Sequence, residues 1–160
     1  MKKFRLLALI IILALVMVAC TGKNQEQTSA YSFHGENEYI AVLNGSIILH
    51  SEEEVFNGGK LELIQKDLFE NVVSYSATFY TLKNDEQRII MSNSVINQTG
   101  DSICIEGDLG KMSGASVLIG NKIESIEELR ENLWFELKII DLSGKETIYQ
   151  IQLNLIENAI

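Results

Sequence analysis

The sequence predicts an all-β domain over residues 31–160, an antiparallel β-sandwich of the immunoglobulin-like type with one short helix. Apolar and polar residues alternate with a period of two along most of this range, as they do in half-buried strands. Turn residues interrupt the alternation about every 8 to 12 positions, which is typical of sandwiches and barrels. Only one stretch has helical spacing, so the strands do not alternate with helices as in an α/β protein. We expect about seven to nine short strands, and the immunoglobulin-like assignment depends on their number and spacing alone.

The domain is predicted to begin with a β-hairpin. Residues 39–43 and 46–50 flank Asn44-Gly45, a dipeptide that readily supplies the two positive φ values of a type I′ turn. The three glutamates at 52–54 are expected to form a solvated acidic bend. A short strand is predicted at residues 60–65.

The middle of the domain contains the next predicted hairpin. Apolar side chains alternate with hydroxyl side chains over residues 73–79, so this strand is half buried. A turn at residues 83–86 leads into a second strand at residues 88–92. Residues 92–114 are the least regular part of the chain, and we expect only short strands and loops there, followed by a strand at residues 115–119.

One short helix is predicted near residue 125. Ser125-Ile126-Glu127-Glu128 matches a capping box, in which the serine hydroxyl accepts from an unpaired amide and the second glutamate reaches back. Ile126, Leu129 and Leu133 have helical spacing, so a single apolar stripe faces the core.

The clearest predicted hairpin lies near the end of the chain. Residues 135–139 and 149–155 both alternate, and the turn at 141–144 joins them. Trp134 has two interpretations: a large aromatic residue fills the core of many sandwiches, whereas the phase of its own strand places Trp134 on the outer, polar face.

The first nineteen residues have the composition of a secretory signal peptide. Residues 1–5 carry three positive charges, and an uncharged apolar run follows over residues 6–19. This run is shorter than the roughly 20 apolar residues that a membrane-spanning helix needs. We therefore expect residues 1–19 to be cleaved from the mature protein.

Met17-Val18-Ala19-Cys20 resembles the lipobox of bacterial lipoproteins. Ala19 and Cys20 fit that pattern, whereas Met17 and Val18 depart from its usual leucine and small residue. The resemblance implies a diacylglycerol thioether on Cys20, cleavage after Ala19 and attachment to the outer face of the cell membrane. Ordinary signal cleavage, with Cys20 left as a free thiol, is the alternative. A lipid with two acyl chains satisfies the requirement for stable anchoring.

Residues 20–30 are predicted to be a lipidated N-terminus and a flexible tether, because they have no apolar periodicity. Loss of the signal leaves 10 of the 13 basic residues against 22 acidic ones, a net charge of −12. Nucleic acid is excluded as a partner by this charge, since its binding requires a basic surface. The acidic domain is also repelled by anionic lipid head groups.

Three groups of residues have metal-ligand chemistry. His34, Glu36 and Glu38 are spaced by two, and His50 precedes the glutamates at 52–54. A third group, Asp101, Glu106 and Asp108, lies in a glycine-bearing segment but lacks the EF-hand order. Solvated polar surface is the simpler interpretation of all three, and we predict no metal ion and no cofactor.

Cys104 is the one candidate nucleophile, and its sequence context does not support catalysis. It lies between Ile103 and Ile105, where we expect a small buried residue, and both histidines are far away in the sequence. With Cys20 lipidated, Cys104 has no intrachain disulfide partner. We predict that the protein is not an enzyme.

Residues 33–39, Phe-His-Gly-Glu-Asn-Glu-Tyr, are similar to the opening segment of small lipoproteins of Gram-positive bacteria to which no activity is assigned. This resemblance covers about a tenth of the mature chain. The sequence thus favours a membrane-anchored extracytoplasmic module that binds an unknown protein or envelope component. A small-ligand or cation-binding accessory of an envelope transporter or stress response is the alternative.

Overall fold

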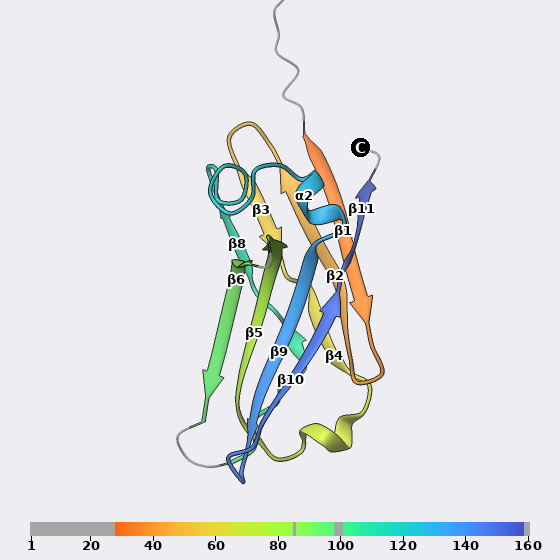
Figure 1. The fold of residues 1–160 in the computed structure, drawn as a ribbon, viewed down its shortest axis with the longest axis vertical. Helices are drawn as coiled ribbons and strands as arrows, with labels where there is room; N and C mark the ends of the chain where they lie inside the picture. Colours follow the sequence, from red (N-terminus) through yellow and green to blue (C-terminus); the bar gives the residue numbers. More distant parts are fainter. Residues whose placement is uncertain (1–27, 85, 98–100, 159–160) are drawn as a thin grey trace, which may run out of the picture.

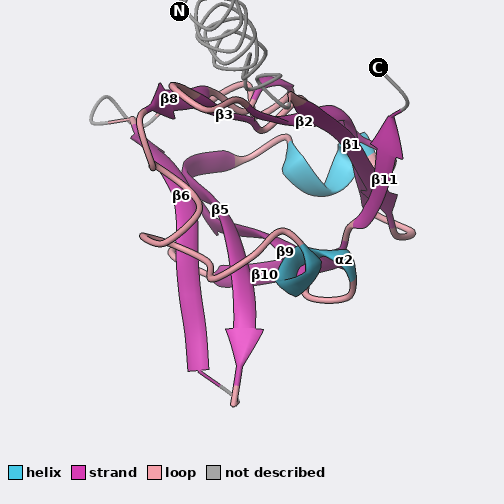
Figure 2. Cartoon of the chain, turned by 90° about the horizontal axis from the view of Figure 1, so that it is seen from above, coloured by secondary structure: helices cyan, strands magenta, loops and turns pink. Residues whose placement is uncertain are grey.

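The structure is a sandwich of two antiparallel β-sheets (Figures 1 and 2). This computed structural model describes residues 28–84, 86–97 and 101–158, which form eleven strands, a 3₁₀ turn, η1 (Lys66–Phe69), and one short helix, α2 (Glu127–Arg130). The predicted all-β antiparallel sandwich is confirmed. More strands are present than the seven to nine expected, because several are only two to four residues long.

The first sheet has seven strands. They are β1 (Ser29–Glu36), β2 (Ile40–Leu49), β3 (Glu54–Asn57), β4 (Lys60–Leu63), β7 (Gly107–Asp108), β8 (Lys111–Gly114) and β11 (Asn154–Asn158). Their order is β11-β1-β2-β3-β8, and β4 pairs with both β2 and β7. The long strand β2 therefore has β1 along one edge and β3 and β4 end to end along the other.

The second sheet consists of two hairpins placed side by side. Its strands are β5 (Val72–Lys83), β6 (Glu86–Ile96), β9 (Leu133–Asp141) and β10 (Glu146–Gln152), in the order β10-β9-β5-β6. Both hairpins were predicted from the sequence and are confirmed, but the strand predicted over residues 149–155 is divided: β10 ends at Gln152, and residues 154–158 form β11 in the first sheet. The predicted half-buried alternation along β5 is wrong over residues 77–81, which are all buried, including Thr78, whose hydroxyl bonds Ser92.

The hairpin predicted at Asn44-Gly45 is wrong, because both residues lie inside the single strand β2. Asn44 has the predicted positive φ of 57°, but this conformation forms a bulge opposite β1. Gly45 faces the ring of Phe33, and a Cβ at Gly45 would lie 2.0 Å from Cε2 of that ring. The bulge divides β2 into the half that pairs with β4 and the half that pairs with β3.

Several element boundaries differ from the prediction. β1 includes Ser29 and Ala30, which were assigned to the tether, and β6 continues to Ile96. Residues 115–119 form turns and one isolated bridge instead of a strand. The sequence analysis also did not anticipate η1, whose buried Phe69 fixes it to the core.

The short helix is present, but its capping differs from the prediction. The Glu128 carboxylate accepts a hydrogen bond from the N–H of Glu124, so it reaches one residue further back than a capping box requires. No side-chain cap is formed at the start of α2. Ile126 and Leu129 are buried as predicted, but α2 ends at Arg130, so Leu133, which is also buried, belongs to the following strand and not to a helical stripe.

The centre of the core is a cluster of four phenylalanine rings. Phe33 and Phe56 come from the first sheet, and Phe79 and Phe135 come from the second. Phe79 contacts all three other rings, at centroid distances of 5.9 Å to Phe33, 5.2 Å to Phe56 and 5.0 Å to Phe135. These contacts join the two sheets directly.

Trp134 lies on the outer face of the second sheet, as the phase of its strand indicated. Its neighbours Leu133 and Phe135 are fully buried, whereas Trp134 is half buried and pairs with Tyr80 and Gln152 on the adjacent strands. The core interpretation of Trp134 is therefore excluded.

Both ends of the described chain lie at the same end of the sandwich (Figure 1). Ala30 at the start of β1 pairs with Asn158 at the end of β11. η1 and the turn between β9 and β10 lie at the opposite end. We refer to that opposite end, made of η1 and residues 37–39, 97, 101–106 and 142–145, as the distal end.

Substituting Gly45 tests the contact that places the bulge. We expect Gly45→Ala to destabilise the full chain by about 1–3 kcal/mol or more, because the new Cβ overlaps the Phe33 ring. Gly144→Ala is the matched control: Gly144 has a φ of 82° but no atom within 4 Å of the Cβ position. It should cost only about 1–2 kcal/mol of backbone strain. Denaturant unfolding measures both changes, and a Gly45→Ala variant as stable as the parent would contradict this packing.

Candidate interaction surface

The connections at the distal end are tied to one another by backbone hydrogen bonds. The N–H of Leu142 donates to the carbonyl of Asn71 at 2.9 Å, and the N–H of Ile103 donates to Val72 at 2.8 Å. On the other side, the N–H of Ile64 donates to Tyr39 at 2.8 Å. The distal end is therefore a structured surface to which both sheets contribute.

Three aromatic rings hold the distal end together. Tyr149 of β10 lies 5.2 Å from Tyr39 and 5.1 Å from Phe69, measured between ring centroids. Burial raises the pKa of Tyr149, and a hydrogen bond to the carboxylate of Glu38 raises that of Tyr39. Because the three residues come from β10, the β1–β2 turn and η1, this cluster fixes η1 across the two sheets.

A groove of about 430 Å³ lies beside η1. We call it the distal groove; it is lined by Leu63, Lys66, Phe69, Glu70, Ser102, Ile103, Cys104, Ile105 and Glu106. A second hollow of about 370 Å³ adjoins it and shares Leu63, Lys66 and Glu106 with it. Both volumes fall in the range of small-ligand sites.

Glu106 connects the two walls of the distal groove. Its carboxylate accepts the N–H of Leu63 at 3.1 Å and the Lys66 ammonium at 3.0 Å. The bond from Leu63, followed by that from Lys66, lowers the pKa of Glu106. Leu63 and Lys66 come from β4 and η1, about forty residues earlier in the chain. The Glu106 carboxylate therefore positions the 101–106 segment against these two elements.

Cys104 opens onto the distal groove, so the prediction that it is buried is wrong. Ile105 is buried and Ile103 packs against the core, so the residue between them points the other way. The Cys104 thiol lies 3.8 Å from the carbonyl oxygen of Glu106. Neither His34 nor His50 lines this groove.

Exposed apolar side chains lie on the same end of the sandwich as the distal groove. Leu68 lies on η1, Ile64 immediately follows β4, and Leu142 lies in the β9–β10 turn, where its backbone is bonded to Asn71. They are 49%, 51% and 57% exposed, respectively. Apolar residues around a groove with a few polar groups form a surface suited to binding.

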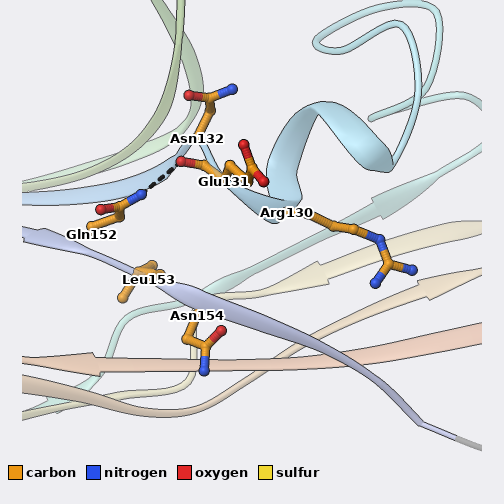
Figure 3. Close-up of a pocket in the computed structure, with 6 residues that line it drawn as sticks. All are labelled: Arg130, Glu131, Asn132, Gln152, Leu153 and Asn154. Carbon is orange, nitrogen blue, oxygen red and sulfur yellow. Dashed lines mark hydrogen bonds between the residues drawn. The ribbon is translucent and has the colours of Figure 1, made fainter.

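Figure 3 shows a different groove, of about 540 Å³, where the chain crosses from β10 to β11. It is lined by Arg130, Glu131, Asn132, Gln152, Leu153 and Asn154. The Gln152 amide donates to the carbonyl of Glu131 at 2.6 Å. The Arg130 side chain extends away from this pair and bonds Glu157 at 2.7 Å. These bonds hold the crossover, so we assign this groove a structural role.

The first candidate metal-ligand group is not assembled. β1 ends at Glu36, so Glu38 lies in the following turn, and His34, Glu36 and Glu38 are all exposed. Within residues 28–84, 86–97 and 101–158, no three His, Cys, Asp or Glu side chains are grouped closely enough to hold a metal ion.

The other two acidic groups contribute to the fold. Glu54 is not part of a solvated bend: its carboxylate accepts the N–H groups of Leu118 and Ile119 at 2.7 and 3.1 Å. In the third group, Glu106 bonds Lys66, while Asp108 accepts the N–H of Gly110 at 2.6 Å. The carboxylates therefore stabilise loops individually.

Comparison with known proteins finds no protein-family model, no curated protein and no solved structure that matches this chain. Cys20, the signal sequence and residues 21–27 lie outside the described residues. In the part of the chain that the structure describes, no helix is long and apolar enough to cross a membrane.

Asp141 at the distal end provides a pH-dependent test of the β9–β10 turn. Its carboxylate accepts bonds from the Ser143 hydroxyl and from the N–H groups of Ser143 and Lys145, and these bonds lower its pKa from 3.8. A lowered folded-state pKa stabilises the fold above the unfolded value, and this stabilisation is lost as the pH falls through the lowered value.

We therefore expect Asp141→Asn to reduce stability at neutral pH and to have a smaller effect in acid. Unfolding of the parent and the variant at several pH values between about 2 and 7 measures the difference. The asparagine variant keeps an acceptor oxygen but does not titrate, so it isolates Asp141 from the other carboxylates. A difference that stays constant across this range would contradict the assignment.

Proposed function

We propose that the protein is a lipid-anchored, extracytoplasmic binding module that is not an enzyme. Cys20 carries the lipid, and the distal end binds a protein, a peptide or another envelope component. The observation that carries this proposal is the position of the distal groove. β1 begins at Ser29, nine residues after Cys20, at the end of the sandwich opposite that groove.

The length of the tether supports this arrangement. Nine residues extend to about 30 Å at most, so an anchor at Cys20 keeps the sandwich close to the membrane. The distal groove is then the part of the sandwich farthest from the point of attachment. A net charge of −12 on the mature chain repels anionic head groups and favours a basic partner.

The contacts in the distal groove support binding over catalysis. The groups that line it bond to one another: Lys66 bonds Glu106, and the described contact of the Cys104 thiol is with the carbonyl of Glu106. A nucleophilic cysteine requires an adjacent base to form the thiolate. The exposed side chains of Leu68, Leu142 and Ile64 at this end of the sandwich instead provide apolar area for a partner.

A small-ligand accessory protein of an envelope transporter or stress response is the second candidate. The volumes of the two adjoining hollows, about 430 and 370 Å³, favour it. Lys66 and Glu106 lie between the hollows and would contact a ligand in either one. This candidate predicts that a solute binds without a partner protein.

Mass spectrometry of the protein extracted from membranes tests the anchor. We expect the mature chain to begin at Cys20 and to carry a diacylglyceryl group, with acyl chains long enough for stable membrane binding. Cys20→Ser should abolish this modification and prevent cleavage after Ala19, whereas Cys104→Ser should change neither. An unmodified Cys20 in the processed chain would overturn the lipid anchor.

Site-specific photo-crosslinking in cells tests the binding surface. We expect a photoreactive residue at Leu142 to crosslink a specific partner, and Leu68→Asp in the same chain to reduce the yield at least about fivefold by placing a charge in the apolar contact. The matched control is Ile156, which is 44% exposed on β11 of the first sheet. Equal crosslinking at Ile156 and Leu142 would contradict a specific distal surface.

A further inference from the structure

Strand β6 leaves one edge of the second sheet uncovered. It is the last strand in the order β10-β9-β5-β6, and every residue from Ser92 to Ile96 is exposed. Residues 89–96, Ile-Ile-Met-Ser-Asn-Ser-Val-Ile, contain no charge and no proline. Natural edge strands are usually protected from pairing by charge, proline, a bulge or a short length, and after the bulge at Ile90 this part of β6 has none of these.

The backbone of β6 is oriented for pairing with another strand. The N–H of Asn97 donates to the carbonyl of Val73 on β5, and Ser74 lies opposite Ile96 in the continuous register. Hydrogen-bonded and non-hydrogen-bonded pairs alternate along antiparallel strands. The N–H and C=O groups of Ser92, Ser94 and Ile96 therefore point away from β5, toward the open edge.

The sequence of β6 is nearly symmetric about Asn93. Reading outward from Asn93, Ser92 corresponds to Ser94 and Met91 to Val95, and beyond the bulged Ile90 another isoleucine, Ile89, corresponds to Ile96. Antiparallel pairing with a second copy about Asn93 places each residue opposite a residue of similar type, such as Ser92 opposite Ser94. This is the self-complementarity that a two-fold symmetric interface requires.

We infer that β6 pairs with β6 of a second copy of this chain, antiparallel and centred on Asn93, so that the two four-stranded sheets become one continuous sheet. Ser92 of each copy lies opposite Ser94 of the other, which gives four backbone hydrogen bonds across the centre. Asn93 lies opposite its equivalent on the two-fold axis.

The exposed apolar residues of β6 fit this register. Ile89, Val95 and Ile96 are 51%, 41% and 71% exposed, and they are three of the ten exposed large hydrophobic residues in the described chain. Ile90 is the extra residue of a bulge and is buried, so Ile89 turns to the outer face, where Ile96 also points. The pairing brings Ile96 of each copy beside Ile89 of the other, and Val95 beside Met91.

The two-fold axis also determines how the dimer lies. Antiparallel pairing places the starts of the two β1 strands at opposite ends of the dimer. Two tethers that each reach about 30 Å can be anchored in one membrane when the strands run along its surface. No residue of β6 lines the distal groove, so the pairing uses none of the side chains that line it.

Cysteine pairs test the register in membranes of cells that express the full chain. In a Cys104→Ser background, one chain carries Ser92→Cys and a second, differently tagged chain carries Ser94→Cys. Opposite residues are about 5.5 Å apart between Cα atoms, whereas Ser92 and its own equivalent are diagonal neighbours at about 7–8 Å. Disulfides require Cα separations below about 7 Å.

We expect oxidation to link the two differently tagged chains at least about tenfold more efficiently than either chain with itself. The Cys104→Ser parent measures any background from Cys20. A yield no higher in the mixture than in the single variants overturns the register. A disulfide formed only with a different protein overturns the second copy as the occupant of this edge.

A proline substitution provides the second test, by measurement of mass in non-ionic detergent. Ser94→Pro removes an N–H that points to the open edge, so the fold should persist while the dimer is replaced by the monomer. Asn93→Pro is the matched control, because its N–H points toward β5 and its loss should destabilise the sheet. A parent chain that is monomeric, or a folded Ser94→Pro variant that remains dimeric, overturns the proposal.

Discussion

Contact between the four phenylalanine rings is the interaction on which the rest of the fold depends. Phe79 contacts Phe33, Phe56 and Phe135, so this one ring joins both sheets. Space for the ring of Phe33 exists only because Gly45 has no side chain. The bulge beside Gly45 in turn allows β2 to pair with β3 and β4 in succession, and β4 leads directly into η1. The shape of the distal end therefore follows from packing at the centre of the core.

The sequence predicted those elements whose signals are local. Both hairpins of the second sheet were recognised because alternation and turn residues lie within about twenty positions of each other. Asn44-Gly45 was misassigned because a positive φ suits both a tight turn and a bulge, and local sequence does not distinguish them. In this chain the Phe33 ring packs against Gly45 and favours the bulge, and the two residues become neighbours only when β1 and β2 pair. The 3₁₀ turn η1 lacks a capping signal and depends on burial of Phe69 for its position.

The distal groove was less predictable than the fold because its walls are distant in sequence. Lys66 and Glu106, which connect those walls, are forty positions apart. The exposure of Cys104 was predictable: alternation around Ile103 and Ile105 places the intervening side chain on the other face. The apolar neighbours of Cys104 favoured burial, whereas its phase relative to them indicates exposure. The candidate metal-ligand groups were clusters in sequence only, because carboxylates such as Glu54 bond backbone amides of a loop more than sixty residues away.

Anchoring at Cys20 and pairing through β6 would reinforce each other. The net charge of −12 that signal cleavage would leave opposes the approach of two copies in solution, but it acts least at a strand edge that carries no charge over residues 89–96. Confinement to one membrane makes the encounter of two anchored copies effectively intramolecular, which raises their effective concentration without any new contact. A short ladder of hydrogen bonds and a few isoleucine contacts then suffices for association. An uncovered edge strand promotes aggregation in a freely diffusing protein. In an anchored protein, the membrane sets the partners, orientation and density, so the same edge can form a specific contact.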